Sequence, residues 1–268
     1  MDSDFLRQKS KWLWQQTLLI HKISQGTRIA SCLSCVDILT VLFYGKILSY
    51  QIGSPDWAHR DRLIVSKAHG SLSLYPIFAE IGYFDKAYLT RVGKSGSILG
   101  DIPDCSIPGY ETVNGSLGHG LGVACGMALA MKCKGLSEKV FVLSGDGELY
   151  EGAVWEAIMF AGHHKLDNLI LIIDNNQKCM LDYTSNVINL SPLAEKFNAF
   201  RWDVYEVEGH EIGKLYETLR NIKNLSAYRP IALIANTVKG KGIVSLEGDP
   251  LCHIRSINPD TIDILAKT

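Results

Sequence analysis

The chain has 268 residues, of which 47% are hydrophobic, and its formal net charge at pH 7 is −1. This length is at the upper end for a single α/β domain, and the apolar side chains suffice for a core. The near-zero charge gives no reason to expect nucleic acid or a membrane surface as a partner. No apolar run approaches the ~18 residues needed to span a bilayer. We therefore expect one domain over residues 1–268.

The first elements expected along the chain are helices. Leu6–Ile23 carries apolar and basic residues at helical spacing, and Val36–Phe43 predicts a second helix with Ser34 as its cap. The seven cysteines are an odd number without a framework spacing, which indicates a reduced, cytoplasmic protein. Cys32 and Cys35 form one CxxC pair, but a zinc site of this kind needs a second pair of ligands.

The next segments alternate between regular elements and loops. The apolar run Leu63–Val65 predicts a strand, and a helix is expected to begin near Ser71. His69 lies between them, where it could be no more than a polar residue at a turn. Val92–Val113 is dense in Gly, Pro and Asp, which is typical of surface loops. Leu117–Met131 is rich in Gly and Ala, as a helix packed closely against others would be.

The second half of the chain contains two short, unbroken apolar runs, Val140–Leu143 and Leu169–Ile173. Such runs fit strands that are covered on both faces of a parallel sheet. Gly152–Lys165 between them has the length and apolar spacing of a helix. Two further strands and a helix between them are expected at Val204–Val207, Ile231–Ala235 and Ile212–Leu219. The sequence therefore predicts a doubly wound α/β domain, with a mostly parallel sheet and helices on both faces.

Polar residues follow each of the two apolar runs. Asp146 stands between two glycines after the first strand, and Asn176 follows the second. Open α/β sheets bind ligands at the carboxyl ends of their strands. Mg²⁺ takes one or two carboxylates and completes its oxygen shell with substrate phosphates and water. A lone Gly-Asp-Gly is also common turn chemistry, but the pair at this spacing predicts a site for a metal ion and a diphosphate.

The segment 145–176, GDGELYEGAVWEAIMFAGHHKLDNLILIIDNN, resembles the thiamine-diphosphate motif of transketolases, in their amino-terminal, diphosphate-binding part. Residues 60–84, 107–132 and 236–243 resemble the same family, and the similarity runs from about residue 10 to 258. The resemblance implies the thiamine-diphosphate-binding fold, and specifically its diphosphate-binding module. It also implies thiamine diphosphate as the cofactor, held with Mg²⁺ or Ca²⁺.

The resemblance assigns roles to individual residues of this chain. The metal ligands that it implies are Asp146, Asn176 and Lys178, the last through its main-chain carbonyl. The cofactor-binding residues that it implies are His69, Gly115, Ser116, Leu117, Gly145, Gly147, Glu148, Asn176 and His253. Among these, Gly147 is expected to offer its main-chain N–H to the diphosphate.

The resemblance also implies that His253 reaches the reaction centre. Three further residues are candidate catalytic residues. Glu151 and Glu156 match a pair at the subunit interface of the family, in a proton relay between two active sites. Their spacing alone would fit a solvated helix face equally well. Arg28 stands where transketolases have a histidine that handles the sugar, and Ile102 replaces a second active-site histidine.

These two replacements bear on the substrate. A histidine titrates near neutrality and moves protons, whereas an arginine is a fixed cation suited to carboxylate or phosphate. We therefore expect the enzyme to use an altered donor or acceptor substrate, such as a carboxylated or nucleotide-linked sugar, with Arg28 in place of the histidine.

Catalysis with thiamine diphosphate also needs a carboxylate that faces the N1′ nitrogen of the cofactor's pyrimidine ring. The cofactor itself serves as the electron sink. In transketolases this glutamate belongs to the pyrimidine-binding domain, which follows the part that this chain resembles. We therefore expect the pyrimidine-binding and C-terminal domains on a partner chain, in an α2β2 assembly, and no activity without it.

The function implied by the resemblance is transfer of a two-carbon ketol or related acyl group between sugar-type substrates. One alternative is the alpha subunit of a 2-oxo acid dehydrogenase or decarboxylase, although the stretches SKAHG (66–70) and NGSLGHG (114–120) favour transketolase. The other alternative is a non-catalytic, cofactor-binding interaction subunit, which would explain the loss of both histidines.

Overall fold

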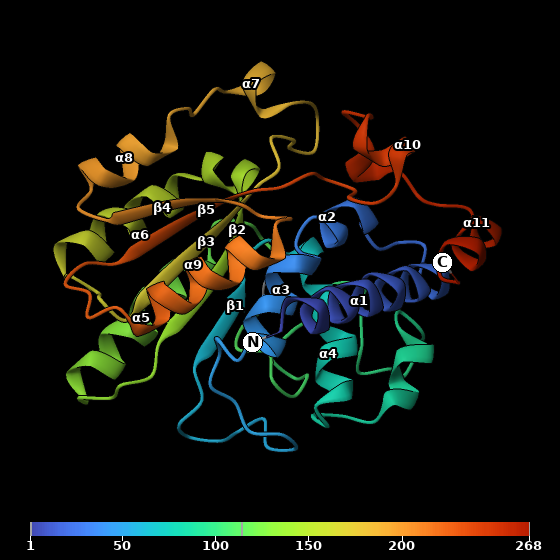
Figure 1. Cartoon of the computed structure of the whole chain (residues 1–268), viewed down its shortest axis with the longest axis horizontal. Helices are drawn as coiled ribbons and strands as arrows, with labels where there is room; N and C mark the ends of the chain where they lie inside the picture. Colours follow the sequence, from blue (N-terminus) through green and yellow to red (C-terminus); the bar gives the residue numbers. More distant parts are fainter. Residues whose placement is uncertain (1, 114, 268) are drawn as a thin grey trace.

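The centre of the protein is a five-stranded sheet in the order β1-β2-β3-β5-β4, in which all neighbouring strands are parallel (Figure 1). The computed structural model describes residues 2–113 and 115–267; Asn114 of the NGSLGHG stretch and the two terminal residues lie outside the described residues. The strands are β1 (Arg62–Val65), β2 (Val140–Gly145), β3 (Leu169–Asn175), β4 (Asp203–Glu208) and β5 (Ile231–Asn236). The predicted parallel α/β architecture is confirmed.

Helices cover both faces of the sheet (Figure 1). On one side lie α1 (Ser3–Ile23), α2 (Ile29–Leu33), α3 (Val36–Tyr44), α4 (Leu74–Glu80) and α9 (Ile212–Asn224). On the other lie α5 (Gly120–Cys133), α6 (Gly152–His163) and α8 (Leu193–Ala199). The shorter elements are α7 (Thr184–Val187), α10 (Val244–Glu247) and α11 (Pro259–Leu265), with 3₁₀ turns at Ala68–Ser73, Lys86–Arg91, Asp146–Tyr150 and Cys252–Ile254.

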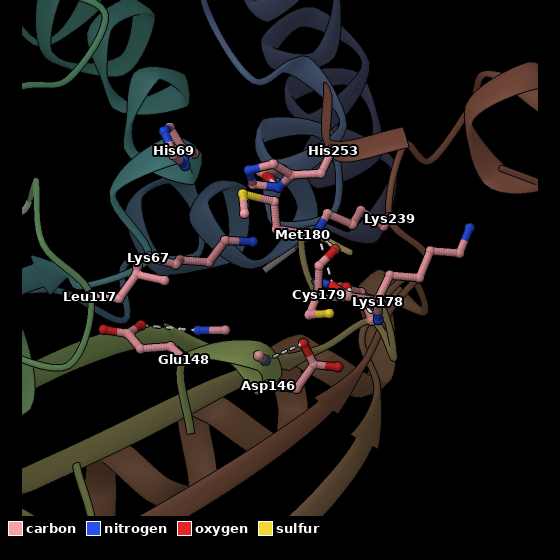
Figure 2. Close-up of a pocket in the computed structure, with 14 residues that line it drawn as sticks. Lys67, His69, Leu117, Asp146, Glu148, Lys178, Cys179, Met180, Lys239 and His253 are labelled. Carbon is pink, nitrogen blue, oxygen red and sulfur yellow. Dashed lines mark hydrogen bonds between the residues drawn. The ribbon is translucent and has the colours of Figure 1, made fainter. Parts of the chain in front are cut away.

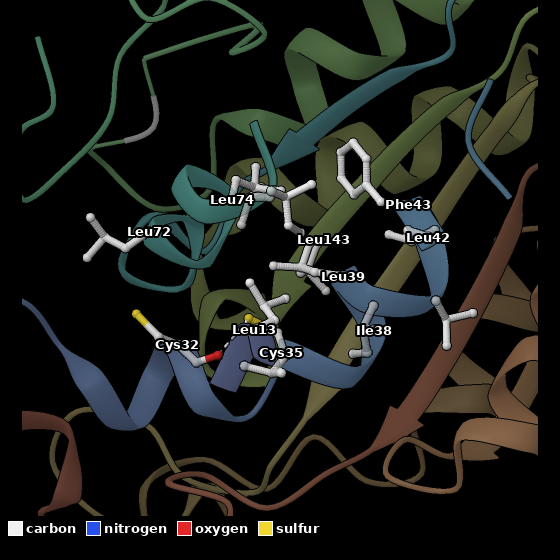
Figure 3. Packing of buried hydrophobic residues seen from close by; sticks show 14 of the residues in the cluster. Leu13, Cys32, Cys35, Ile38, Leu39, Leu42, Phe43, Leu72, Leu74 and Leu143 are labelled. Atoms are coloured by element: carbon white, nitrogen blue, oxygen red, sulfur yellow. Dashed lines mark hydrogen bonds between the residues drawn. The ribbon is translucent and has the colours of Figure 1, made fainter. Parts of the chain in front are cut away.

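The apolar strands are unbroken because both faces of the sheet are buried. In β2, Phe141 and Leu143 join the cluster beneath α1–α4 and α9, part of which is shown in Figure 3. Val140 and Val142 point the other way, into the cluster beneath α5, α6 and α8. Side chains of this kind each contribute about 1.5–3 kcal/mol when fully buried. The two cores therefore hold the carboxyl ends of the strands, and the loops after them, in fixed positions.

Most predicted elements are confirmed, but several boundaries differ by a few residues and one cap is wrong. The helix expected from Leu117 begins only at Gly120, and the chain near Ser71 forms a 3₁₀ turn before α4. Ser34 does not cap α3, whose N-cap is Cys35. The Ser34 hydroxyl instead donates to the buried Asp174 carboxylate at 2.6 Å, because an unsatisfied buried carboxylate costs more than an uncapped helix.

All seven cysteines are free thiols. The buried Cys32 and Cys35 donate from their thiols to the carbonyls of His69 at 2.9 Å and Gly70 at 3.5 Å. The CxxC pair thus fastens the loop after β1 to α2 and to the start of α3. Within the part of the chain that is described, no helix is both long and apolar enough to cross a membrane.

Candidate cofactor site

A pocket opens at the carboxyl ends of β2 and β3, and Figure 2 shows its lining. Its walls come from α2, from the loops after β1, β2, β3 and β5, from the segment before α5 and from the 3₁₀ turn near the end of the chain. The lining residues are Ser31, Lys67, His69, Leu117, Gly145, Asp146, Gly147, Glu148, Asn176, Lys178, Cys179, Met180, Lys239 and His253. Segments far apart in the sequence therefore meet at the edge where the strand-end motifs predicted a ligand.

Asp146 begins the 3₁₀ turn after β2 and is only 6% exposed. Its carboxylate accepts main-chain hydrogen bonds from Gly147, at 2.8 Å, and from Gln177, which joins the loop after β2 to the loop after β3. Burial and the nearby Asp174 carboxylate raise the pKa of Asp146 to about 7. A buried carboxylate of this kind gains from a bound cation, which would offset both effects.

Asn176 and Lys178 lie directly after β3. The Asn176 side-chain oxygen accepts from the Lys178 main-chain N–H at 3.2 Å. Among the described residues, no group of three or more His, Cys, Asp or Glu side chains could hold a metal ion. A divalent cation here would depend on Asp146, the Asn176 amide, a main-chain carbonyl and oxygens of its ligand. This donor set fits Mg²⁺ or Ca²⁺ held together with a diphosphate.

Asp174 ties the loops beneath the pocket together. Its carboxylate is fully buried and pairs with the Lys67 ammonium. It also accepts hydrogen bonds from Ser34, from Thr237 and, at 3.2 Å, from the Asn176 amide nitrogen. Although burial opposes ionisation, the Lys67 ammonium holds the pKa of Asp174 below its ordinary value. The same pair fixes which way the Asn176 amide faces.

Lys67, Lys178 and Lys239 are all buried and line the pocket, but the Lys178 ammonium donates to the carbonyls of Glu247 and Asp249. Lys239 lies in the loop after β5. Its ammonium donates to the carbonyls of Lys178 at 2.9 Å and Cys179 at 3.1 Å. Burial and the neighbouring Lys67 charge lower the pKa of Lys239 to about 8. Two ammonium groups in one pocket favour a polyanion such as a diphosphate.

Two histidines face the pocket on the side away from Asp146 (Figure 2). The rings of His69 and His253 meet edge to face, with centroids 5.2 Å apart. Burial, together with the charges of Arg28 and Lys239, lowers the pKa of His69, and burial with the same charges lowers that of His253 to about 3. The His253 Nδ1 atom lies 3.2 Å from the Ser31 hydroxyl oxygen. Both imidazoles are therefore neutral at neutral pH in the absence of an anion.

Glu148 lines the pocket, but its carboxylate is turned into the protein and is 2% exposed. It accepts from the Ser144 hydroxyl at 2.8 Å, from the Gly118 N–H at 2.9 Å and from the Ser66 hydroxyl. These contacts hold the start of α5 against β1 and β2, and thereby place Leu117 at the pocket.

Not every predicted site residue lies in the pocket. Gly115 and Ser116 are exposed in the preceding loop and do not line it. Glu151 and Glu156 are exposed at the start of α6; Glu156 borders a separate hollow between α5 and α6. Arg28 is half-buried outside the lining, and acts on the two histidines through its charge.

Several residues that line the pocket have no role predicted from the sequence: Ser31, Lys67, Cys179, Met180 and Lys239. Signals for the two lysines were present, because Lys67 stands two residues before His69 in SKAHG and Lys239 belongs to the 236–243 stretch. Nothing in the sequence distinguishes Lys239 from Lys241, or shows that Lys67 pairs with Asp174.

Residues 19–268 match the family described as transketolase, thiamine diphosphate binding domain. The chain belongs to the transketolase family. It is 37% identical over 263 residues to one subunit of the apulose-4-phosphate transketolase of Actinobacillus succinogenes, and the match covers 97% of this chain and 94% of that protein. It is also 37% identical to human transketolase over 224 residues, or 83% of this chain and 35% of the human protein.

The fold agrees with this membership. A crystal structure of transketolase from Campylobacter jejuni superposes with a TM-score of 0.90 and 29% identity. The match covers all of this chain and 43% of the Campylobacter chain. The chain corresponds to the amino-terminal, thiamine-diphosphate-binding part of transketolases. The predicted family, the fold and a thiamine-diphosphate-binding domain are confirmed, while the divalent metal stays a prediction.

Proposed function

We propose that this chain is the diphosphate-binding subunit of a transketolase-like enzyme that transfers a two-carbon ketol, or a related acyl group, between sugar-type substrates. The observation that carries the proposal is the pocket that gathers Asp146, Asn176, two ammonium groups and two neutral histidines. Relatives of similar length are themselves named as subunits of a transketolase, which supports a division of the enzyme between chains.

The metal and the diphosphate would be held at the end of the pocket formed by the loops after β2 and β3. Asp146, Asn176 and the Lys178 carbonyl would hold Mg²⁺ or Ca²⁺, while Lys67 and Lys239 would face the diphosphate. A hydrogen bond from the Gly147 N–H to the diphosphate would compete with the one that it makes to the Asp146 carboxylate at 2.8 Å. A Cβ on Gly147 would lie 3.1 Å from that of Cys179, so glycine keeps this approach open. When bound, thiamine diphosphate supplies the electron sink for carbon–carbon bond cleavage.

The two histidines of the pocket would contact oxygen atoms of the substrate. His69 and His253 are neutral and can each accept or donate a proton at a hydroxyl or carbonyl oxygen. Arg28 would place a fixed positive charge beside them, which suits a substrate with a carboxylate or phosphate. Glu151 and Glu156, exposed on α6, would take part in a proton relay with a second copy.

The partner is proposed to be a second chain that carries the pyrimidine-binding and C-terminal domains and the catalytic glutamate, in an α2β2 heterotetramer. A cytoplasmic location is proposed because all seven cysteines are free thiols.

The decisive experiment is purification of the tagged chain from its own cells in buffer with Mg²⁺ and thiamine diphosphate. Co-purification of one stoichiometric chain, and ketol transfer by the pair, is the expected result. Ketol transfer by the single chain would overturn the split arrangement. Recovery of the chain alone, with cofactor bound, would favour the non-catalytic role, and 2-oxo acid decarboxylation by the pair would favour the dehydrogenase alternative.

Cofactor binding has its own test in thermal unfolding, since a ligand that binds only the folded state raises the melting temperature. Thiamine diphosphate with Mg²⁺ should raise that of the wild type. Asp146→Asn should remove most of the shift, whereas Asp167→Asn, at the opposite end of the sheet, should retain it. Equal shifts in both variants would remove Asp146 from the metal site.

A further inference from the structure

The side chain of Lys178 is buried, yet its ammonium makes no ion pair in the described part of the chain. In Figure 2 this side chain points away from Asp146. The ammonium donates to the main-chain carbonyl of Glu247 and, at 3.3 Å, to that of Asp249, and it lies 5.5 Å from the centre of the Tyr183 ring. Burial of an ammonium group without a carboxylate costs free energy unless hydrogen bonds compensate it. The two carbonyls therefore hold the Lys178 side chain in place.

The final 3₁₀ turn, which carries His253, is held in shape by Asp249. The Asp249 carbonyl accepts from the Cys252 N–H at 3.2 Å, and the Asp249 carboxylate pairs with the Arg255 guanidinium at 2.7 Å. Asp249 thus contacts both the start of the turn and the residue that follows it. Because Lys178 donates to the same carbonyl, its ammonium fixes the position of the whole turn relative to the loop after β3.

The His253 ring depends on the position of this turn. Its partners are the Ser31 hydroxyl, 3.2 Å from Nδ1, and the His69 ring, and both belong to segments far away in the sequence. In the described part of the chain, Lys178 supplies the only hydrogen bonds between the loop after β3 and the segment from α10 to the final 3₁₀ turn. Without them, one side of the turn loses its attachment to the pocket wall.

We propose that Lys178 is a positioning residue for His253: its ammonium ties the final 3₁₀ turn to the loop after β3 and so holds the imidazole at the pocket. This rests on the proposed function, in which His253 transfers protons at the substrate. The two ends of Lys178 then serve different purposes, since its carbonyl is proposed to bind the metal. A lysine suits the task because its flexible stem lets one ammonium reach two carbonyls of another segment.

The first test is NMR of the full chain labelled with ¹³C-histidine, without cofactor or partner. In the wild type, the edge-to-face contact of His69 and His253 should give an Overhauser effect between the two rings. Lys178→Met cannot donate and should lose this signal, whereas Lys178→Gln, whose shorter amide can still donate, should weaken it less. Lys196→Met removes a lysine-to-carbonyl bond on α8 and should leave the signal unchanged. If neither Lys178 variant weakens the signal, the inference is wrong.

The second test separates positioning from a general loss of structure. In the assembled enzyme, Lys178→Met should lower kcat about tenfold, because misplacement of a reacting group is costly. The thermal shift produced by thiamine diphosphate with Mg²⁺ should persist. In the His253→Ala background, Lys178→Met should lower kcat by less than about twofold, since residues that act through one another are not additive.

The outcomes distinguish the inference from the proposed function. A further tenfold loss of kcat in the His253→Ala background would mean that Lys178 does not act through His253, and would overturn the inference. If the assembled wild type performs no ketol transfer while the contact between the two rings still depends on Lys178, the proposed function fails and the positioning role stands.

Discussion

The rings of His69 and His253 meet edge to face with centroids 5.2 Å apart, although one follows β1 and the other lies near the end of the chain. The contact depends on two buried supports. The Cys32 thiol donates to the His69 carbonyl at 2.9 Å, and the Ser31 hydroxyl lies 3.2 Å from the His253 Nδ1 atom. Both supports belong to α2, so one short helix positions the two imidazoles.

His253→Ala should therefore reduce catalysis more than it reduces cofactor binding. Loss of a neutral imidazole that transfers protons at the substrate should lower kcat of the assembled enzyme about 10²-fold. The thermal shift produced by Mg²⁺ and thiamine diphosphate should persist, because the Asp146 side of the pocket is unchanged. His163→Ala, an exposed change on α6, is the matched control. A variant with normal kcat would assign His253 to packing alone.

Removing one member of the Lys67–Asp174 pair should lower the free energy of unfolding more than replacing both members does. Lys67→Met leaves the Asp174 carboxylate buried without its cation, and we expect a loss of about 3–5 kcal/mol in the free energy of unfolding. Lys67→Met with Asp174→Asn should recover a large part of this loss, since no unpaired charge remains. Urea unfolding of the single and double variants measures both effects.

A surface pair gives the control. Lys9 and Glu80 form an ion pair with about a quarter of each side chain exposed, so Lys9→Met should cost less than about 1 kcal/mol. A Lys67→Met variant that is no less stable than Lys9→Met would show that Asp174 is satisfied by its hydroxyl and amide donors alone.

The strand-end motifs were predictable because they are local. A buried parallel strand requires an unbroken apolar run, and the polar residues that follow it must lie at the sheet edge. Asp146 and Asn176 could therefore be placed from the sequence alone. The resemblance added His69 and His253, and the structure brings all four to one pocket.

The lysines could not be predicted in the same way. Whether Lys67 points into a pocket or onto a surface depends on the position of Asp174, more than a hundred residues later in the chain. Lys239 acquires its place from two carbonyls of a different loop. The error at Ser34 has the same origin, because a serine near a helix start caps it only when no buried carboxylate competes. These are tertiary contacts, and local patterns do not record them.

His21 should make the fold sensitive to mild acid. It is fully buried, its Nδ1 atom lies 2.6 Å from the Thr27 hydroxyl oxygen, and its Nε2 atom accepts from the Ile257 N–H at 3.3 Å. Burial lowers the pKa of His21 to about 4 from an ordinary value of 6.5. The unfolded chain thus binds more protons than the folded one between these values, so stability is complete above about pH 6.5 and falls as the pH drops toward 4.

His21→Gln should flatten this dependence, because glutamine keeps a hydrogen-bonding side chain without a titrating group. The measurement is the urea midpoint at pH 7.5 and at pH 5.5, with His163→Gln as the exposed control. The wild type and the control should lose more stability between the two values than His21→Gln does. Identical losses in all three proteins would place the acid sensitivity elsewhere, for instance at His253, whose pKa is also lowered.

Arg28 should determine which substrate the assembled enzyme accepts. Its charge reaches both pocket histidines, yet in the described part of the chain it makes no ion pair, so a substrate anion is its natural counterion. Arg28→Ala should raise KM for an acidic substrate at least about tenfold, with little change in the thermal shift produced by thiamine diphosphate and Mg²⁺. Arg28→Lys keeps the charge without the planar guanidinium, so its KM should lie between those of the wild type and Arg28→Ala. Equal loss of substrate and cofactor binding in Arg28→Ala would mean that Arg28 serves the diphosphate, and that the substrate is recognised by other residues.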